Sequence, residues 1–264
     1  MKKNHIQTLR EQSPLIHNIT NTVVANYVAN GLLSMGCSPI MSDAIEEMDE
    51  IPAMSQALVI NIGTLTSVKV KSMIKAGKSA NKHNIPVVLD PVGVGATTFR
   101  KKIVQTLLSD IKFDLIRGNA GEIAHLAQVN WNAKGVDAGT GKADLSQIAK
   151  DVAKKYNSIV SISGEIDYIS EGNKVVKIHN GTTLFPKITG SGCLLSAICG
   201  AFLTLENDNF DLVVSACTTY AIAGEIVKEN LDDNQTGQFY IRLLDSLTSI
   251  DDETVKKYSK ISFE

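Results

Sequence analysis

The segment Ala57–Asp90, ALVINIGTLTSVKVKSMIKAGKSANKHNIPVVLD, decides the fold of this chain. It begins with the continuous apolar run 57–62, which ends at Gly63 and is typical of a strand buried on both faces. An amphipathic helix is predicted over Thr66–His83, and PVVLD at 86–90 predicts a second buried strand. A buried strand, a helix and another buried strand predict parallel pairing with a right-handed crossover.

The alternation of strands and helices continues on both sides of this segment. Further strands are predicted at 38–41, 114–116 and 159–162, and further helices at 22–35, 99–108 and 120–128. Tyr168–Ile178 predicts a hairpin that turns at 171–173, and after Ser191 the pattern predicts helices only. We therefore expect a single α/β domain over residues 1–264, with a mostly parallel central sheet flanked by helices and an antiparallel edge hairpin.

The composition argues against several functional classes. Hydrophobic residues make up 44% of the 264 residues, and the formal net charge of -2 gives no positive field to attract nucleic acid or an anionic membrane. The apolar stretches are too short to span a bilayer, and the first residues lack the apolar core of a secretory signal. The four cysteines form no C-x-x-C pair. We therefore expect reduced thiols, no zinc site and a cytoplasmic protein.

Polar and glycine-containing motifs follow four of the predicted strands. They are Asn61-Ile-Gly63, Asp90-Pro-Val-Gly93, Arg117-Gly-Asn119 and Ser163-Gly-Glu165. In open α/β sheets, ligands bind beyond the carboxyl ends of the strands, so these motifs predict one ligand site along that edge. Loops after strands are polar in any protein, and this accounts for part of the pattern.

The strongest local signal is ITGSGCLLSAICGAF, at 188–202. Its apolar residues leave no polar face, so a buried central helix is predicted, and two glycines flank Ser191 at the start of that helix. Unpaired N–H groups at a helix start attract anions, which predicts a phosphate site here. Cys193 lies in this first turn, where the helix dipole is expected to lower the thiol pKa. The alternative is a small, inert core residue.

Two further motifs carry ionisable groups. Asp90 at a strand end suits magnesium or a metal-bound water, although Asp before Pro also starts ordinary turns. Asn119 and Glu122 have the spacing of a helix capping box, which gives Glu122 a structural explanation. Arg117 has a planar guanidinium suited to phosphate oxygens.

Taken together, these motifs resemble the hydroxyethylthiazole kinases, which are ribokinase-like enzymes of thiamine salvage. The resemblance covers nearly the whole chain in the family's order. It rests on PLIHNITNTVVANYVANGLLSMGCSPIMS (14–42), NIGTL (61–65), VVLDPVGVGATTFR (87–100), IRGNAGEI (116–123), SISGEIDYI (161–169) and ITGSGCLLSA (188–197). The first and last of these are specific to the family, whereas the segments at Asp90 and Arg117 are shared more widely among ribokinase-like enzymes.

The resemblance implies a ribokinase-like fold, a reaction and a set of roles. The family transfers the γ-phosphate of ATP, with Mg²⁺, to the hydroxyl of 4-methyl-5-(2-hydroxyethyl)thiazole. The resemblance also implies a homotrimer whose active sites lie between subunits. Catalysis is expected at Cys193. Contact with the thiazole is expected from Met41, Gly190 and Asn21. Arg117 and Ser163 are expected to bind ATP. Asp90 and Glu122 are expected to bind the magnesium ion, directly or through water.

Cys193 separates this family from its relatives. Many ribokinase-like enzymes have an aspartate there, as the evident general base, so the base is less obvious in this chain. Ser163 and Ser191 stand where the family often has threonine, which retains the hydroxyl. The alternatives are a hydroxymethylpyrimidine or sugar kinase, a nucleotide-driven dehydratase of hydrated nicotinamide cofactor, and a non-catalytic protein that binds thiazole or nucleotide.

Overall fold

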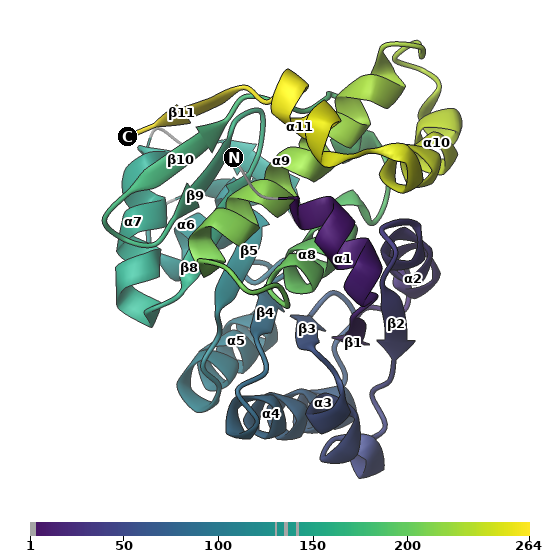
Figure 1. Cartoon of the computed structure of the whole chain (residues 1–264). Coiled ribbons are helices and arrows are strands. Elements are labelled where there is room, and N and C mark those ends of the chain that lie inside the picture. Colours follow the sequence, from purple (N-terminus) through teal and green to yellow (C-terminus); the bar gives the residue numbers. More distant parts are fainter. Residues whose placement is uncertain (1–3, 130, 135–136, 141–142) are drawn as a thin grey trace.

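A nine-stranded sheet runs through the molecule in the order β11-β10-β9-β8-β5-β4-β3-β1-β2 (Figure 1). The computed structural model describes residues 4–129, 131–134, 137–140 and 143–264, with side chains other than those of 132–134 and 137–140. The strands are β1 Leu15–Ile19, β2 Ser38–Met41, β3 Ala57–Asn61, β4 Val87–Asp90, β5 Leu115–Asn119, β6 Asn132–Lys134, β7 Asp137–Thr140, β8 Ile159–Ser163, β9 Asp167–Ser170, β10 Val175–Ile178 and β11 Ile261–Phe263. Strands β6 and β7 form a separate two-stranded sheet.

Helices cover both faces of the large sheet. They are α1 His5–Gln12, α2 Ala25–Ser34, α3 Glu50–Met54, α4 Ser67–Lys82, α5 Thr98–Asp110, α6 Ala120–Leu126, α7 Leu145–Tyr156, α8 Ser191–Phe202, α9 Asn209–Lys228, α10 Thr236–Ser249 and α11 Asp252–Tyr258, with short 3-10 helices η1 Ile45–Glu47 and η2 Phe185–Lys187. Figure 1 shows α4 and α5 on one side of the sheet and α8 and α9 on the other.

Two apolar clusters, one on each face, account for this layering. Successive residues of a strand point to opposite faces, so Val59 and Val88 join the cluster under α2, α8 and α9 while Leu58 and Leu89 join the cluster under α4 and α5. All five residues of β3 are buried. The predicted continuous apolar runs are therefore explained by a strand covered on both sides.

The predicted parallel sheet is confirmed. Strands β2, β1, β3, β4, β5 and β8 pair in parallel, and β9, β10 and β11 add an antiparallel edge. The hairpin is present as β9 and β10, with Gly172 in its turn at φ +101°. The prediction of helices only after Ser191 is wrong, because Ile261–Phe263 pairs with β10. This strand is too short to show a periodic pattern.

Strand β1 is absent from the sequence-based prediction because two polar residues interrupt its apolar run. His17 and Asn18 are nevertheless both buried within it. The ring of His17 bonds the carbonyl of Ser42 through Nε2 at 3.0 Å, and burial lowers the pKa of this histidine. Strand β1 lies between β2 and β3, so it joins the edge strand that carries Met41 to the centre of the sheet.

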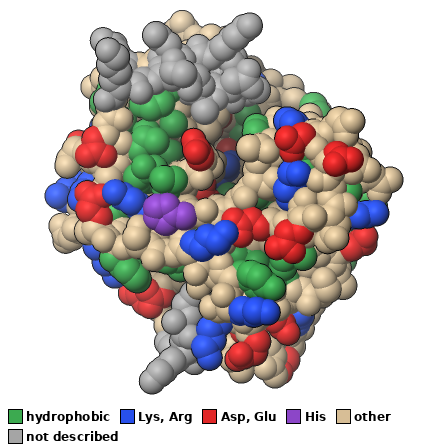
Figure 2. Space-filling view, turned by 90° about the horizontal axis from the view of Figure 1, so that it is seen from above, with side chains coloured by type: hydrophobic (Ala, Val, Ile, Leu, Met, Phe, Trp, Pro, Cys, Tyr) green, Lys and Arg blue, Asp and Glu red, His purple; other side chains and the backbone are tan. Residues whose placement is uncertain are grey.

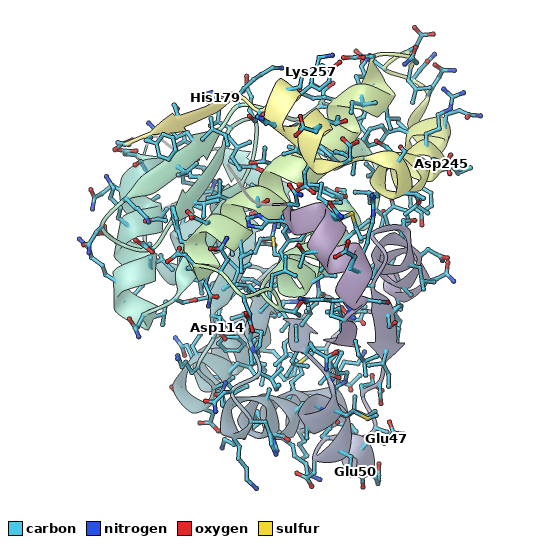
Figure 3. The ribbon with its side chains drawn as sticks, in the orientation of Figure 1. Glu47, Glu50, Asp114, His179, Asp245 and Lys257 are labelled. Carbon is cyan, nitrogen blue, oxygen red and sulfur yellow. The ribbon has the colours of Figure 1, made fainter. Side chains whose placement is uncertain are left out.

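Helix α9 is long and apolar enough to cross a membrane by length and composition, but 83% of its apolar window is buried inside the fold. It is therefore a core helix. The upper face of the molecule has acidic and basic side chains interspersed around a central hollow (Figure 2). Asp114, labelled in Figure 3, marks the amino-terminal edge of the sheet, where its carboxylate accepts the N–H of Val87 at 2.9 Å.

Candidate functional site

The four polar motifs meet at one edge of the sheet, as their positions in the sequence predict. Asn61, Asp90, Asn119 and Ser163 are the last residues of four neighbouring parallel strands, β3, β4, β5 and β8. Asn61 lies opposite Asp90 in the register of one pair, and Asn119 lies opposite Ser163 in another. Parallel strands end at a common edge, and so the fold itself gathers these side chains.

Asp90 lies at the centre of this edge and is 1% exposed. Its Oδ2 accepts hydrogen bonds from Asn61 Nδ2 and from Ser196 Oγ on α8, both at 2.8 Å. The guanidinium Nη1 of Arg117 lies 4.0 Å from the same oxygen. The other carboxylate oxygen of Asp90, Oδ1, has no hydrogen-bond partner among the described residues. Burial raises the pKa of Asp90, whereas Arg117, Ser196 and Asn61 act to lower it.

Glu122 performs the capping role that its spacing predicts and also reaches the next loop. Its Oε2 accepts the N–H of Asn119, and the side chain of Asn119 accepts the N–H of Glu122 in return. Its Oε1 accepts the N–H of Gly93 at 2.8 Å. Burial, together with the charge of Asp90, raises the pKa of Glu122 to about 7. The carboxylate thus ties the loop after β4 to the start of α6.

Arg117 and Ser163 are in direct contact, with the guanidinium Nη2 donating to the serine hydroxyl. The buried Arg117 is also beside the start of α8, because a Cβ added to Gly192 would lie 2.5 Å from Nη1. Glycine at this position lets the helix backbone lie close to the guanidinium without displacing it. The Nε of Arg117 has no partner among the described residues. Asp167, whose pKa burial raises to about 6, also acts electrostatically on this arginine.

Helix α8 begins as predicted, with Gly190 as its N-cap at φ +93°. A Cβ on Gly190 would lie 2.9 Å from Val24 Cγ1, so the turn also packs closely against the start of α2. Tyr220 on α9 donates to the carbonyl of Ser191 at 2.8 Å, and the hydroxyl of Ser191 donates to the carbonyl of Phe185 at 2.8 Å. These bonds fix the helix start beside Arg117.

Cys193 and Asn21 are also brought together at this edge. The side-chain amide of Asn21 donates to the Cys193 sulfur at 3.4 Å and to Asn61 Oδ1 at 3.0 Å. Asn21 follows β1 and is 5% exposed. Residues assigned to different roles by the resemblance therefore belong to one hydrogen-bonded group that runs from Cys193 to Asp90.

The predicted fall in the Cys193 pKa is wrong. Burial, together with the nearby charge of Asp90, raises the pKa of this thiol to about 12, although Asn61, Arg117 and Asn21 act to lower it. Desolvation and a nearby carboxylate therefore outweigh the helix dipole. The thiol is half-buried and, like the other three cysteines, free of disulfide bonds. At neutral pH it is a protonated group.

Met41 is the predicted site residue that stands apart. It ends β2, the edge strand, and is separated from β3 by β1. Its side chain is partly buried against the same apolar cluster that Cys193 borders.

Neither of two cavities in the described part of the chain lies at this edge. One, of about 450 Å³, is lined by residues of α5 and α6 together with Trp131 and Tyr156. The other, of about 750 Å³, lies between the end of α9 and α11. Neither is lined by Asp90, Arg117 or Cys193.

Sequence reasoning missed two residues that the group depends on. The sequence motifs include Asn61 only as part of a strand end and Ser196 only as part of a buried helix. The signal for Ser196 was a lone polar residue on an otherwise apolar helix, since a buried hydroxyl needs a partner. For Asn61 the signal was its position at the end of a strand predicted to adjoin the strand of Asp90.

The comparisons with solved structures support a kinase fold. A pyridoxal kinase from Staphylococcus aureus, in complex with pyridoxal, has the same fold with a TM-score of 0.62 at 13% identity, covering 95% of this chain and 97% of that one. A hydroxyethylthiazole kinase protein from Pyrococcus horikoshii OT3 is more similar, with a TM-score of 0.89 at 37% identity and coverage of 98% and 97%. The layered sheet and its polar carboxyl edge define a small-molecule kinase of the ribokinase-like class.

The sequence comparisons give the family. The model of the hydroxyethylthiazole kinase family matches residues 6–253. A hydroxyethylthiazole kinase of Pasteurella multocida (strain Pm70) is 59% identical over 266 residues, with both chains covered in full. One of Listeria monocytogenes serotype 4a (strain HCC23) is 52% identical over 256 residues, covering 97% of this chain and 95% of the relative. The chain belongs to the hydroxyethylthiazole kinase family.

The raised pKa of Glu122 predicts a specific dependence of stability on pH. Because the folded pKa of about 7 exceeds the ordinary value of 4.5, the folded state loses stability as pH rises through this window and stays less stable above it. Each pH unit of difference corresponds to about 1.4 kcal/mol, so the effect is on the order of 3 kcal/mol. Glu122→Gln keeps a capping side chain without the charge.

The measurement is urea unfolding of metal-free wild type and Glu122→Gln between pH 4.5 and 8. The variant should gain stability relative to wild type as the pH rises, with most of the gain between pH 5 and 7. Parallel stability profiles for the two proteins would contradict a raised pKa at Glu122.

Proposed function

We propose that this chain transfers the γ-phosphoryl group of ATP to the hydroxyl of 4-methyl-5-(2-hydroxyethyl)thiazole, giving the thiazole phosphate and ADP for thiamine biosynthesis and salvage. The observation that carries the proposal is a half-buried thiol, Cys193, in the first turn of α8, in a chain whose full-length relatives are hydroxyethylthiazole kinases. We also propose that the enzyme works in the cytoplasm, where its four thiols would remain reduced.

The binding of phosphates is assigned to Arg117, Ser163 and the start of α8. The N–H groups of the first helical turn have no intrahelical partners, and their partial positive charge favours an anion. Arg117 lies against this turn, with its Nε unpaired among the described residues. The guanidinium and the helix start together would stabilise the negative charge of the transferring phosphoryl group. Ser163 holds the guanidinium and takes part in nucleotide binding.

The carboxyl groups fit a magnesium ion. Asp90 offers Oδ1, a buried oxygen without a partner among the described residues, whereas both oxygens of Glu122 accept backbone N–H groups. We therefore assign Asp90 to the ion or its bound water, and Glu122 to contact through water. In the described part of the chain no group of three or more His, Cys, Asp or Glu could hold a metal ion, so an ion here would need water and phosphate oxygens besides these carboxylates. When bound, Mg²⁺ neutralises charge on the phosphates.

Cys193 is assigned to orient the attacking hydroxyl. A thiol whose pKa is raised to about 12 is a poor general base at neutral pH. A loose phosphoryl-transfer transition state needs little deprotonation of the nucleophile, so positioning suffices. The hydroxyl oxygen forms the new bond to phosphorus, the bond to the departing ADP oxygen breaks, and the alcohol proton passes late to solvent water. Asn21 holds the Cys193 sulfur in place for this step.

The acceptor pocket is assigned to Asn21, Gly190 and Met41, in a homotrimer whose sites lie between subunits. Two exposed apolar side chains, Val23 and Val68, which are 69% and 66% exposed, support a site completed by another copy. Val23 follows Thr22, whose N–H donates to Thr64 Oγ1 in the loop that leads to α4. The thiazole ring and a neighbouring subunit would each cover part of the apolar surface around Val23 and Val68.

The trimer predicts a particle of about three times 28.4 kDa in light scattering. Val23→Asp should shift the mass towards monomer and lower turnover, because it places a charge in the proposed interface. Phe263→Asp, at an exposed position of β11 on the opposite edge of the sheet, serves as the control. A fully active monomer would contradict the shared site.

The central experiment is a coupled assay for ADP with the thiazole alcohol, ATP and Mg²⁺. Turnover should be well above the ATPase background, and removal of magnesium by a chelator should abolish it. Parallel reactions with a hydroxymethylpyrimidine and with a sugar test the other kinase activities. Binding of the thiazole in calorimetry without ADP formation would favour the non-catalytic alternative and sink the proposal.

Variants of Cys193 test its assigned role. Cys193→Ala should lower kcat about tenfold, the effect of losing one positioning hydrogen bond, with KM for ATP nearly unchanged. Cys193→Asp should retain or raise kcat, because a carboxylate can orient the hydroxyl and also accept its proton. Steady-state kinetics of the three proteins provide the measurement. An unchanged kcat in Cys193→Ala would show that the thiol has no part in the reaction.

A further inference from the structure

Asn61 occupies the centre of the hydrogen-bonded group at the carboxyl edge. It is the last residue of β3 and is 1% exposed. Its Oδ1 accepts the N–H of Gly63 at 2.9 Å and the amide of Asn21 at 3.0 Å, and its Nδ2 donates to Asp90 Oδ2 at 2.8 Å. Because a backbone N–H can only donate, the bond from Gly63 fixes which end of the amide is oxygen. The Nδ2 group is therefore directed at Asp90.

The surrounding loop holds this amide in one orientation. A Cβ on Gly63 would lie 2.7 Å from both Cβ and Nδ2 of Asn21, so the glycine lets the loop press against that side chain. Arg100 donates to the carbonyls of Ile62, Gly63 and Val92, which joins the loop after β3 to the loop after β4. Asn61 thus lies inside a braced pair of loops.

We propose that Asn61 is a positioning residue that fixes the Asp90 carboxylate and the Asn21 amide in one geometry. It thereby holds the phosphoryl-transfer end and the acceptor end of the site in a fixed position relative to each other. This inference rests on the proposed function for the identity of the two ends. Asn61 and Ser196 both donate to Oδ2 of Asp90, which turns Oδ1 to the unpaired position. On its other side Asn61 supplies the acceptor for Asn21, whose amide also contacts Cys193.

A purely space-filling role for Asn61 makes a different prediction from a donor role. Aspartate has nearly the same shape as asparagine but cannot donate to Asp90, and it adds a like charge beside that carboxylate. If Asn61 only fills space, both Asn61→Asp and Asn61→Ala should lose stability in urea, while the folded enzyme keeps its kcat. If Asn61 acts as a donor, Asn61→Asp should be at least as harmful as Asn61→Ala.

The first test measures kcat, KM and unfolding by urea for wild type, Asn61→Asp and Asn61→Ala. We expect kcat to fall about 10- to 100-fold in both variants, with the larger loss in Asn61→Asp. Asn81→Asp is the matched control, because Asn81 Nδ2 donates to the carbonyl of Lys112 away from the site. This control should retain kcat. Near wild-type turnover in Asn61→Asp would overturn the proposal.

The second test measures thiazole binding by calorimetry on protein free of nucleotide and metal. Asn61→Ala should weaken binding about as much as Asn21→Ala, and the double variant should be little worse than either, because the two residues act as a unit. Additive losses would refute a positioning role. If the wild type neither binds nor phosphorylates the thiazole, the proposed function is refuted. If the wild type turns over normally and the Asn61 variants are unaffected, only the role of Asn61 is refuted.

Discussion

The burial of one carboxylate at the end of β4 is the constraint on which the rest of this edge depends. A charged group with almost no access to water is costly unless it is hydrogen-bonded or paired. Asp90 meets that requirement through groups from three other elements, namely Asn61 of β3, Ser196 of α8 and Arg117 of β5. Each partner must lie within a few ångströms, which fixes neighbouring strand ends and the central helix relative to one another.

Helix α8 satisfies this constraint because its apolar body and its first turn have different roles. Its apolar body is buried against the sheet, where Gly200 lets it approach Val59 so closely that an added Cβ would lie 2.8 Å from Cγ2. Gly192 in its first turn lets backbone N–H groups without intrahelical partners lie close to Arg117. The packing energy of the body therefore holds a site of partial positive charge at the sheet edge, next to the buried carboxylate.

Much of the fold was predictable because the strands that matter are continuously apolar and end in polar motifs. The meeting of Asp90, Arg117 and Ser163 at one edge follows from parallel pairing alone. Strand β1 was not predicted because the buried residues His17 and Asn18 interrupt its apolar pattern. Strand β11 was not predicted because three residues are too few to show a periodic pattern. The thiol pKa of Cys193 could not be predicted, since it depends on desolvation and on the distance to Asp90, which are properties of the folded chain.

The guanidinium of Arg100 has a consequence for motion. By holding carbonyls of the loops after both β3 and β4, it makes these two loops move as one body. Opening or closing of the site on this side would require several charge-assisted hydrogen bonds to break together.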